Sequence, residues 1–191
     1  MRRIAIIGPL GAGKSTLALK LGRLLGIPVH HLDWLYWGDS WSPTPPLEWQ
    51  ALLDQIVAGE SWIIDGNFTS SLPPRLAAAD TVIYLDLSPL TSTIRVTKRR
   101  ILHRWRRAPG MPGGSRPMFN AQLFRWIWEF RGEHRQRLLG QLSEPSLADK
   151  TIVLRSPRDV RRFMRSVRDR GAPVSTPGPF DGPEHHNKGR L

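Results

Sequence analysis

The clearest chemical signal in this sequence is a glycine-rich loop that ends in a lysine and a serine. Gly8, Gly13, Lys14 and Ser15 fit the pattern G-x-x-x-x-G-K-[ST], between an apolar run at 4–7 and a helical pattern. A strand that delivers such a loop to a helix start points unpaired backbone N–H groups and the positive end of the helix dipole at a phosphate. The lysine then supplies charge to the β and γ phosphates of a nucleotide, and the serine hydroxyl can bind Mg²⁺. The alternative is a glycine-rich turn ahead of an ordinary helix.

This pattern predicts a nucleotide-binding segment that extends from the strand end into the first helical turn. The glycines let the backbone curl around a phosphate without Cβ clashes. Lys14 is also predicted to be catalytic, because phosphoryl transfer depends on positive charge around the transferred group. The predicted nucleotide-binding residues are Gly8, Gly11, Ala12, Gly13, Lys14, Ser15 and Thr16.

Three aspartates, Asp33, Asp65 and Asp86, each follow a segment that is predicted to be a strand. Strands that alternate with helices form a parallel sheet, and ligands bind at the edge where its carboxyl ends meet. Asp65 is the predicted Mg²⁺ ligand together with Ser15, and Asp86 is its competitor. We favour Asp65 because Gly66 permits a ligand to approach closely. Since polar residues also end strands for solvation alone, we expect at least one of the three aspartates to be a bystander.

The segment after the second strand has two interpretations. Asp33 is predicted to be a catalytic residue that orients or deprotonates an acceptor hydroxyl, whereas its structural alternative is to cap a turn. The aromatic side chains that follow either stack on a planar acceptor or form a local core, and the core is favoured because tryptophan is usually buried for its area. His30 and His31 alternate in a strand, so they point to opposite faces and cannot share a metal ion. The aromatic residues are Trp34, Tyr36, Trp37 and Trp41.

The net charge of +12 is concentrated in two segments. Residues 95–107 hold seven Lys or Arg and no acid, and residues 155–170 hold seven Arg against two Asp. A site for several phosphates requires clustered arginines, which is the favoured interpretation. The alternatives are a nucleic-acid surface and a solvated helix face.

Part of this charge falls in a predicted helical lid. Two basic arms flank the stretch 108–117, which has three prolines and three glycines, and such a hairpin can close over ATP and exclude water. A hairpin with solvated arginines is the alternative. The predicted lid arginines are Arg95 and Arg99 on one arm and Arg125, Arg131 and Arg135 on the other, with Arg99 and Arg131 as catalytic residues.

Hydrophobic periodicity and turn residues predict the remaining elements. Gly26 is expected to end the first helix, and Thr44 to cap the second. Expected strands lie at 4–7, 28–32, 61–64, 81–85 and 151–154, and expected helices at 14–25, 45–57, from 88 onward, 118–142 and from 156 onward.

Composition sets the broad class of the protein. The 191 residues predict one domain over 1–171, with a lid or insertion at about 99–135, and a disordered tail at 172–191. Hydrophobic residues at 40% suffice for a core, and the absence of cysteine suits a reducing cytoplasm. We expect a cytoplasmic protein without a membrane partner, because the apolar runs are too short to cross a bilayer.

These residues resemble a known group, the adenylate-kinase-like P-loop nucleotide kinases. The resemblance is carried by the loop, by Asp65-Gly66 at a strand end, and by Arg95-x-x-x-Arg99 before an insertion. The phrases HLDWLYW (31–37), WIIDGNF (62–68) and FRWIWEFR (124–131) are similar to those of bacterial topology modulation proteins. The resemblance covers about residues 1–170. It implies a three-layer α/β fold with a five-stranded parallel sheet in the order 2-3-1-4-5 and a helical lid.

The resemblance also implies roles for single residues. Lys14, Ser15 and Asp65 would serve phosphates and Mg²⁺, Arg95 would lie near the base of ATP, and Arg99 near its phosphates. The chain departs from adenylate kinases where they carry Asp-Gly-Phe-Pro-Arg, because Asn67 and Phe68 follow Asp65-Gly66 here, and the next arginine is Arg75. AMP is therefore not predicted as the acceptor.

Two functions follow from these patterns. The first is an enzyme that transfers the γ-phosphate of ATP, with Mg²⁺, to a small acceptor, a nucleotide or a nucleoside. The alternative is a nucleotide-dependent DNA-binding or topology-modulating protein without small-molecule kinase activity, which would use the basic helices.

Overall fold

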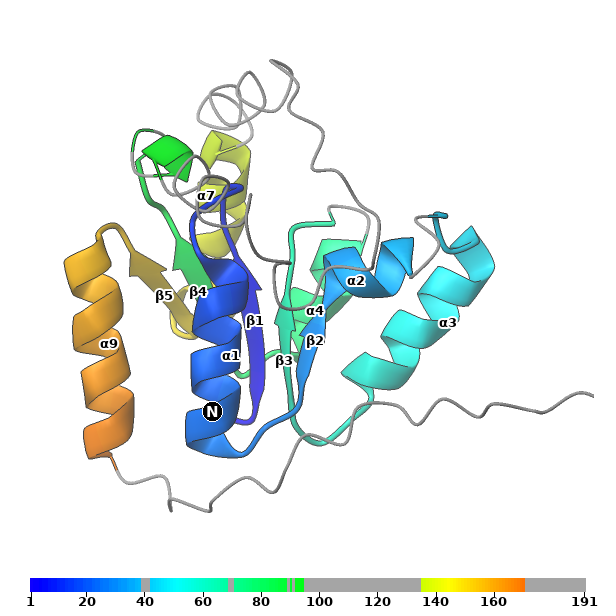
Figure 1. The fold of residues 1–191 in the computed structure, drawn as a ribbon, viewed down its shortest axis with the longest axis horizontal. Helices are drawn as coiled ribbons and strands as arrows, with labels where there is room; N and C mark the ends of the chain where they lie inside the picture. The colour runs from blue at the N-terminus through cyan, green and yellow to red at the C-terminus, as the bar shows by residue number, and fades with distance from the viewer. Residues whose placement is uncertain (39–41, 69–70, 89, 91, 95–134, 171–191) are drawn as a thin grey trace, which may run out of the picture.

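The chain folds around a five-stranded, all-parallel sheet (Figure 1). The computed structural model describes residues 1–38, 42–68, 71–88, 90, 92–94 and 135–170. The strands pair in the order β2-β3-β1-β4-β5, which confirms the predicted sheet. Their bounds are β1 (Arg3–Ile7), β2 (Val29–His31), β3 (Trp62–Asp65), β4 (Thr81–Leu85) and β5 (Thr151–Leu154).

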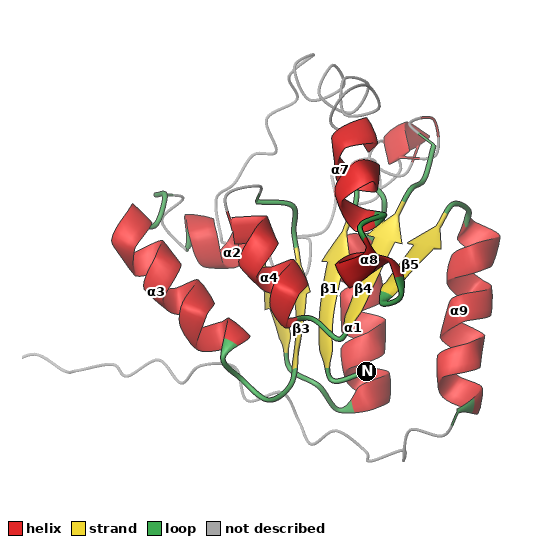
Figure 2. Ribbon diagram, turned by 180° about the vertical axis from the view of Figure 1, so that it is seen from behind, coloured by secondary structure: helices red, strands yellow, loops and turns green. Residues whose placement is uncertain are grey.

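Helices cover the sheet on both sides. On one face α1 and α9 lie side by side, and on the other face lie α3, α4, α7 and α8 (Figures 1 and 2). The described helices are α1 (Lys14–Leu25), α2 (Leu32–Trp37), α3 (Pro46–Val57), α4 (Leu72–Ala78), α7 (Arg135–Leu142), α8 (Pro145–Ala148) and α9 (Pro157–Asp169).

Each face of the sheet has its own hydrophobic core, because successive strand residues point to opposite sides. In β1, Ile4 and Ile6 pack toward α1 and α9, whereas Ala5 and Ile7 pack toward the helices on the other face. All four side chains are at most 1% exposed. A sheet buried on both faces produces the continuous apolar strands seen in the sequence.

Several boundaries follow from local chemistry. Gly26 ends α1 in a left-handed conformation (φ 67°), and its N–H donates to the carbonyl of Gly22. Ser156 caps α9: its hydroxyl accepts from the N–H of Asp159 and donates to the Asp159 carboxylate. Thr44 does not cap α3, contrary to expectation, because its hydroxyl donates to the carbonyls of Leu35 and Tyr36.

The structure adds three short helices that the sequence did not predict, α2, α4 and α8. Helix α2 begins directly after β2, so Asp33 lies in the first turn of a helix and not at the end of a strand. Of the helix expected from 88 onward, the structure describes residue 88, which is not helical, and residues 90 and 92–94, which are. Of the expected helix 118–142, the structure describes α7; the central part of the lid and the tail lie outside the described residues.

Within the described ranges, none of the helices is both long and apolar enough to cross a membrane.

Candidate nucleotide site

The loop between β1 and α1 has the backbone conformation that its glycines predict. Gly8, Gly11 and Gly13 have φ values of 146°, 77° and 95°, which residues other than glycine rarely adopt. No side chain caps the first turn of α1, and this turn contains no acidic residue. Ser15 and Thr16 are exposed in that turn, while Ala12 is buried beneath the loop. The positive dipole end of α1 is thus neither capped nor neutralised by a side chain of its own first turn.

Gly8 has a second reason to be glycine. A Cβ at this position would lie 2.6 Å from the carbonyl oxygen of Leu85 in β4, a distance no side chain tolerates. The Gly8 N–H donates to Oδ1 of Asn67, at 3.1 Å. The loop is therefore fixed at its base by the neighbouring strand and by the segment after β3.

Lys14 lies folded over its own loop. Its Nζ donates to the carbonyl oxygens of Gly8, at 2.9 Å, and Pro9, at 3.2 Å. Burial lowers the pKa of the ammonium group, and the charges of Asp33 and Asp65 oppose this shift. The side chain is thus an ammonium group held at the centre of the loop with two carboxylates nearby.

The side chains of Ser15 and Asp65 form a hydrogen bond at the carboxyl edge of the sheet. The Ser15 hydroxyl donates to Oδ2 of Asp65 at 2.7 Å, and Asp65 is only 4% exposed. The other carboxylate oxygen, Oδ1, forms a hydrogen bond with Nδ1 of His31. The strand register explains the hydrogen bond between His31 and Asp65, because these two residues of β2 and β3 pair directly. His30 is half-buried, and its pKa is lowered by burial and by His31.

Asp86, the competing carboxylate, is held by an arginine. Arg135, at the start of α7, donates from Nε to Oδ1 at 2.8 Å and from Nη2 to Oδ2 at 2.6 Å. Such a two-pronged pair saturates both oxygens of the carboxylate. Arg135, predicted to belong to the lid, therefore ties α7 to the end of β4.

Asp33 lies close to the same group of charges. Partial burial raises the pKa of its carboxyl group; Lys14 and His31 oppose the shift, and Asp65 adds to it. The residue itself reaches solvent. The structure thus brings Lys14, Ser15, Asp33 and Asp65 together at the carboxyl edge of the sheet, as the topology predicts.

Sequence reasoning missed the role of Arg75. This arginine is fully buried (0% exposed) and donates four hydrogen bonds to carbonyl oxygens. Burial lowers its pKa to about 10, so the guanidinium group is charged at neutral pH. The segment that it holds includes Asn67, which in turn holds Gly8. The four acceptors belong to Gly66, Asn67, Phe68 and Ser71.

Gly66 is required by its packing against the start of α2. Its φ is 138°, and a Cβ would lie 2.8 Å from Cβ of Leu32. This contact between the segment after β3 and the start of α2 is a structural reason for the glycine, and the expectation that it makes room for a ligand stays a prediction. The sequence signal, an Asp-Gly pair after an apolar strand, does not distinguish the two reasons.

The aromatic cluster divides into two parts. Tyr36 forms a local core, with ring centroids 5.2 Å from Trp49 and 5.0 Å from Phe68. Trp34 is 48% exposed and meets His31 edge-on, at 5.5 Å between ring centroids. Trp37 is 36% exposed and packs edge-on against Tyr36. The core interpretation thus holds for Tyr36, whereas Trp34 is largely at the surface beside Asp33.

The remaining predicted residues lie outside the described part of the chain. They are Arg95, Arg99, Arg125, Arg131 and Trp41.

The donors at the site suit Mg²⁺ and a polyphosphate. Mg²⁺ takes oxygen ligands, keeps several waters, and is usually bound through one or two protein groups plus substrate phosphates. The Ser15 hydroxyl and the Asp65 carboxylate, 2.7 Å apart, are such a pair beside the loop. No group of three or more His, Asp or Glu side chains forms a metal cluster in the described ranges. A Mg²⁺ ion at this place would therefore also need oxygen ligands from the phosphates of a bound substrate.

Comparisons with known proteins bear on the fold. No protein-family model and no curated protein sequence matches the chain. Among solved structures, the shikimate kinase of Acinetobacter baumannii in complex with shikimate matches with a TM-score of 0.50 at 16% identity, over 87% of this chain and 90% of that one. At this identity the match shows the fold alone: the chain has the P-loop kinase fold.

Two further solved structures match over similar lengths. The deoxyadenosine kinase of M. mycoides, with dCMP and a flexible dCDP bound, matches at 15% identity and a TM-score of 0.49, over 87% of this chain and 97% of that one. A gluconokinase from Sinorhizobium meliloti 1021 matches at 16% identity and a TM-score of 0.47, over 88% and 90%.

Proposed function

We propose that this protein binds ATP with Mg²⁺ at the β1–α1 loop and transfers the γ-phosphoryl group to a small acceptor. The observation that carries the proposal is the contact between Ser15 and Asp65 next to the loop. A glycine-rich turn of purely structural use requires neither a lysine centred on its carbonyls nor a buried carboxylate beside its serine. The P-loop kinase fold is consistent with this function.

Each residue of the loop has a definite task in this proposal. Backbone N–H groups in the first turn of α1 bind phosphate oxygens, and Lys14 exchanges its contacts with the loop carbonyls for contacts with phosphate. Ser15 and Asp65 hold Mg²⁺, which supplies charge that stabilises the transferred phosphoryl group. His31 fixes the orientation of Asp65 by occupying its second oxygen.

Asp33 is the proposed base for the acceptor. A raised pKa makes a carboxylate a better proton acceptor. In the reaction, the acceptor hydroxyl oxygen forms a bond to the γ-phosphorus, its proton passes to Asp33, and the bond to the β–γ bridging oxygen breaks to release ADP. The positions of Lys14 and Asp65 near Asp33 agree with an acceptor hydroxyl that lies beside the γ-phosphate.

The acceptor is proposed to be a nucleotide or nucleoside. The support is Trp34, whose exposed ring lies one residue from Asp33 and offers a stacking surface to a planar base. Arg95, Arg99 and Arg131 remain proposed contacts to the nucleotide and its transferred phosphate. A relation to topology modulation proteins likewise remains a proposal that rests on the Trp-containing phrases.

The test is a phosphoryl-transfer assay with γ-labelled ATP, Mg²⁺ and a panel of nucleotides, nucleosides, shikimate and sugar acids. The expected result is transfer to a nucleotide or nucleoside, with a KM for that acceptor that rises in Trp34→Ala and not in Trp37→Ala. Trp37 is the matched control, because it belongs to the same helix and packs against Tyr36. Intact ATP binding without transfer to any acceptor would contradict the proposed activity.

A further inference from the structure

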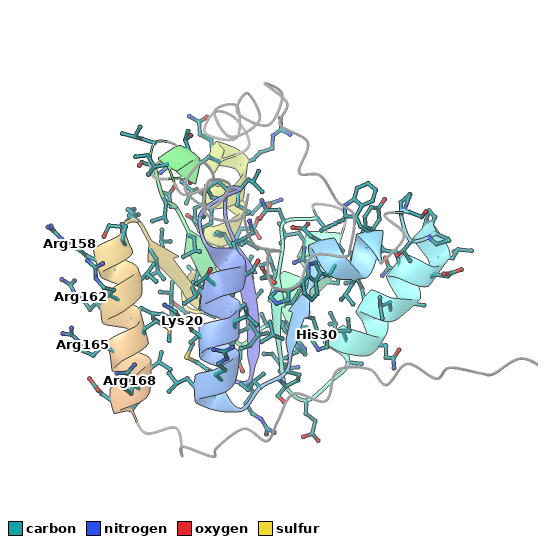
Figure 3. The ribbon with its side chains drawn as sticks, viewed as in Figure 1. Lys20, His30, Arg158, Arg162, Arg165 and Arg168 are labelled. Atoms are coloured by element: carbon teal, nitrogen blue, oxygen red, sulfur yellow. The ribbon has the colours of Figure 1, made fainter. Side chains whose placement is uncertain are left out.

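Helix α9 carries a row of arginines that the proposed reaction does not use. Arginines 158, 161, 162, 165 and 168 of this helix are all exposed, and the flanking residues Arg155 and Arg170 are exposed as well. Figure 3 shows Arg158, Arg162, Arg165 and Arg168 projecting from α9 away from the sheet. We call the five exposed arginines of α9 the α9 arginine row.

The opposite face of α9 is fixed to the domain core. Val167 is 7% exposed, and three partly buried side chains pack with it against the apolar cluster beneath. The arginines therefore stand on a rigid helix whose orientation the core determines. The three partly buried side chains are Val160, Phe163 and Met164.

Neighbouring acids offset only part of the charge of the row. Of the two aspartates in this segment, Asp159 accepts hydrogen bonds from Ser156 at the helix cap, and Arg162 contributes to the lowering of its pKa. Asp169 is exposed at the helix end. None of the ion pairs found among the described residues involves α9. Like charges three and four residues apart repel each other on a helix, so the row favours an external anion.

The length of the row indicates a polyanion. Arg158 and Arg168 are ten residues apart, which is about 15 Å along a helix. A single phosphate group or a free nucleotide is too short to contact both ends. A nucleic-acid strand has a phosphate about every 3.4 Å along the axis of a duplex, so one strand can place several phosphates along the row.

The chemistry of the row favours a duplex over other polyanions. The segment 155–170 uses arginine for all seven basic residues and no lysine, and the guanidinium fork matches phosphate oxygens in pairs. A membrane-binding helix needs an apolar face turned to the lipid, but that face of α9 is packed on the core. Single strands are held by exposed aromatic platforms, and none of the large exposed hydrophobic side chains among the described residues belongs to α9. The major groove of B-form DNA is wide enough to admit a helix, whereas that of double-stranded RNA is deep and narrow.

We propose that the α9 arginine row is a docking surface for double-stranded DNA, which it contacts through the phosphate backbone without reading sequence. The surface lies on the outer helix of the face formed by α1 and α9 (Figure 1). Exposed Lys20 of α1 belongs to the same face (Figure 3) and adds one positive charge to it.

The test measures binding of the full chain to a fluorescent 30-base-pair duplex of mixed sequence by anisotropy, over a series of salt concentrations. The parent is compared with Arg162→Gln/Arg165→Gln and with the control Arg3→Gln/Arg137→Gln, which removes the same charge from exposed positions outside the face formed by α1 and α9. Glutamine keeps the helix propensity, and unfolding curves check that both variants are folded.

The expected result is a log–log salt slope that falls by about 1.8 in the α9 variant, since each lost phosphate contact removes about 0.9, and stays unchanged in the control. Equal losses in the two variants would assign binding to net charge and overturn the proposal. So would a flat salt response, no binding to the duplex, or equal or tighter binding to single-stranded DNA, double-stranded RNA or phosphatidylserine vesicles. The assay contains no nucleotide, so its outcome is independent of the kinase activity.

Discussion

The two oxygens of Asp65 bond to the hydroxyl of Ser15, at 2.7 Å, and to the ring of His31, whereas both oxygens of Asp86 are occupied by the guanidinium group of Arg135. Asp65 is the last residue of β3 and Asp86 directly follows β4. These two strands flank β1, so strand order alone does not distinguish the two aspartates. Their partners distinguish them. A carboxylate bonded to an uncharged hydroxyl can take a metal ion, while one bonded in two places to a guanidinium group is already neutralised.

The first prediction separates these two carboxylates by substitution. Asp65→Asn is expected to weaken the Mg²⁺-dependent part of ATP affinity by about 10–100-fold, because it removes the charge beside Ser15. Asp86→Asn is expected to keep that Mg²⁺ dependence and to lose about 1–3 kcal/mol of stability, because Arg135 loses an ionic partner. The measurement is ATP titration at several Mg²⁺ concentrations, with denaturant unfolding of both variants. The reverse pattern would reassign the metal to Asp86.

Lys14→Ala is the second prediction. The variant is expected to keep the parent's fold, because Lys14 bonds only to carbonyls of its own loop among the described residues. It is expected to lose ATP-dependent thermal stabilisation, which at a hundred times the dissociation constant amounts to about 2.7 kcal/mol in the parent. Differential scanning fluorimetry with and without MgATP measures the effect. A variant with the parent's full shift in Tm would show that the lysine does not bind the nucleotide.

The third prediction concerns Arg75, which is buried among the carbonyls of the segment after β3. Arg75→Met is expected to cost about 3–5 kcal/mol of unfolding free energy, because several buried acceptors lose their donor at once. The exposed Arg23→Met is the control and should change stability by less than about 1 kcal/mol. Urea unfolding measures both. A loss for Arg75→Met no larger than that of the control would contradict the structural role.

The fourth prediction is a pH dependence at Asp33. Its pKa in the folded protein is raised above the ordinary value of 3.8, so the folded state binds the proton more tightly than the unfolded state. The charged carboxylate therefore destabilises the fold at neutral pH, and this penalty disappears as the pH falls through the raised pKa toward 3.8. Asp33→Asn should be more stable than the parent at pH 7, with a difference that vanishes near pH 4.

The measurement for Asp33 is urea unfolding of parent and variant between pH 4 and pH 8. Because acids far from Asp33 titrate equally in both proteins, the difference between the two curves reports on Asp33 and on the charged neighbours coupled to it, Lys14, His31 and Asp65. A difference that stays constant over the range, or that grows as the pH falls, would contradict the assigned direction.

Local features made much of the fold predictable. The loop, its strand and its helix are contiguous in sequence, and the apolar strands are short runs that a doubly covered sheet requires. Gly26 and Ser156 mark helix ends through bonds within a few residues of themselves. Such signals depend on nearby residues alone, so they can be read before any tertiary structure is known.

The contacts that define the site are mostly not local. His31 bonds to Asp65 only because β2 and β3 pair in one register, 34 residues apart in sequence. Arg75 looks like a surface residue in the sequence, since a fully buried charge is uncommon, and its acceptors are backbone atoms that no pattern of side chains reveals. The short helices α2 and α4, of 6 and 7 residues, offer too few turns for a periodic signal.

The proposed function requires nucleotide binding at the β1–α1 loop, and isothermal titration calorimetry of the full chain with ATP tests this binding. With Mg²⁺ present, we expect a saturable heat of one site per chain, which weakens in excess EDTA and is lost in Lys14→Ala. No heat with ATP or GTP at millimolar concentration, or an equal heat in parent and Lys14→Ala, would show that this loop is not the nucleotide site.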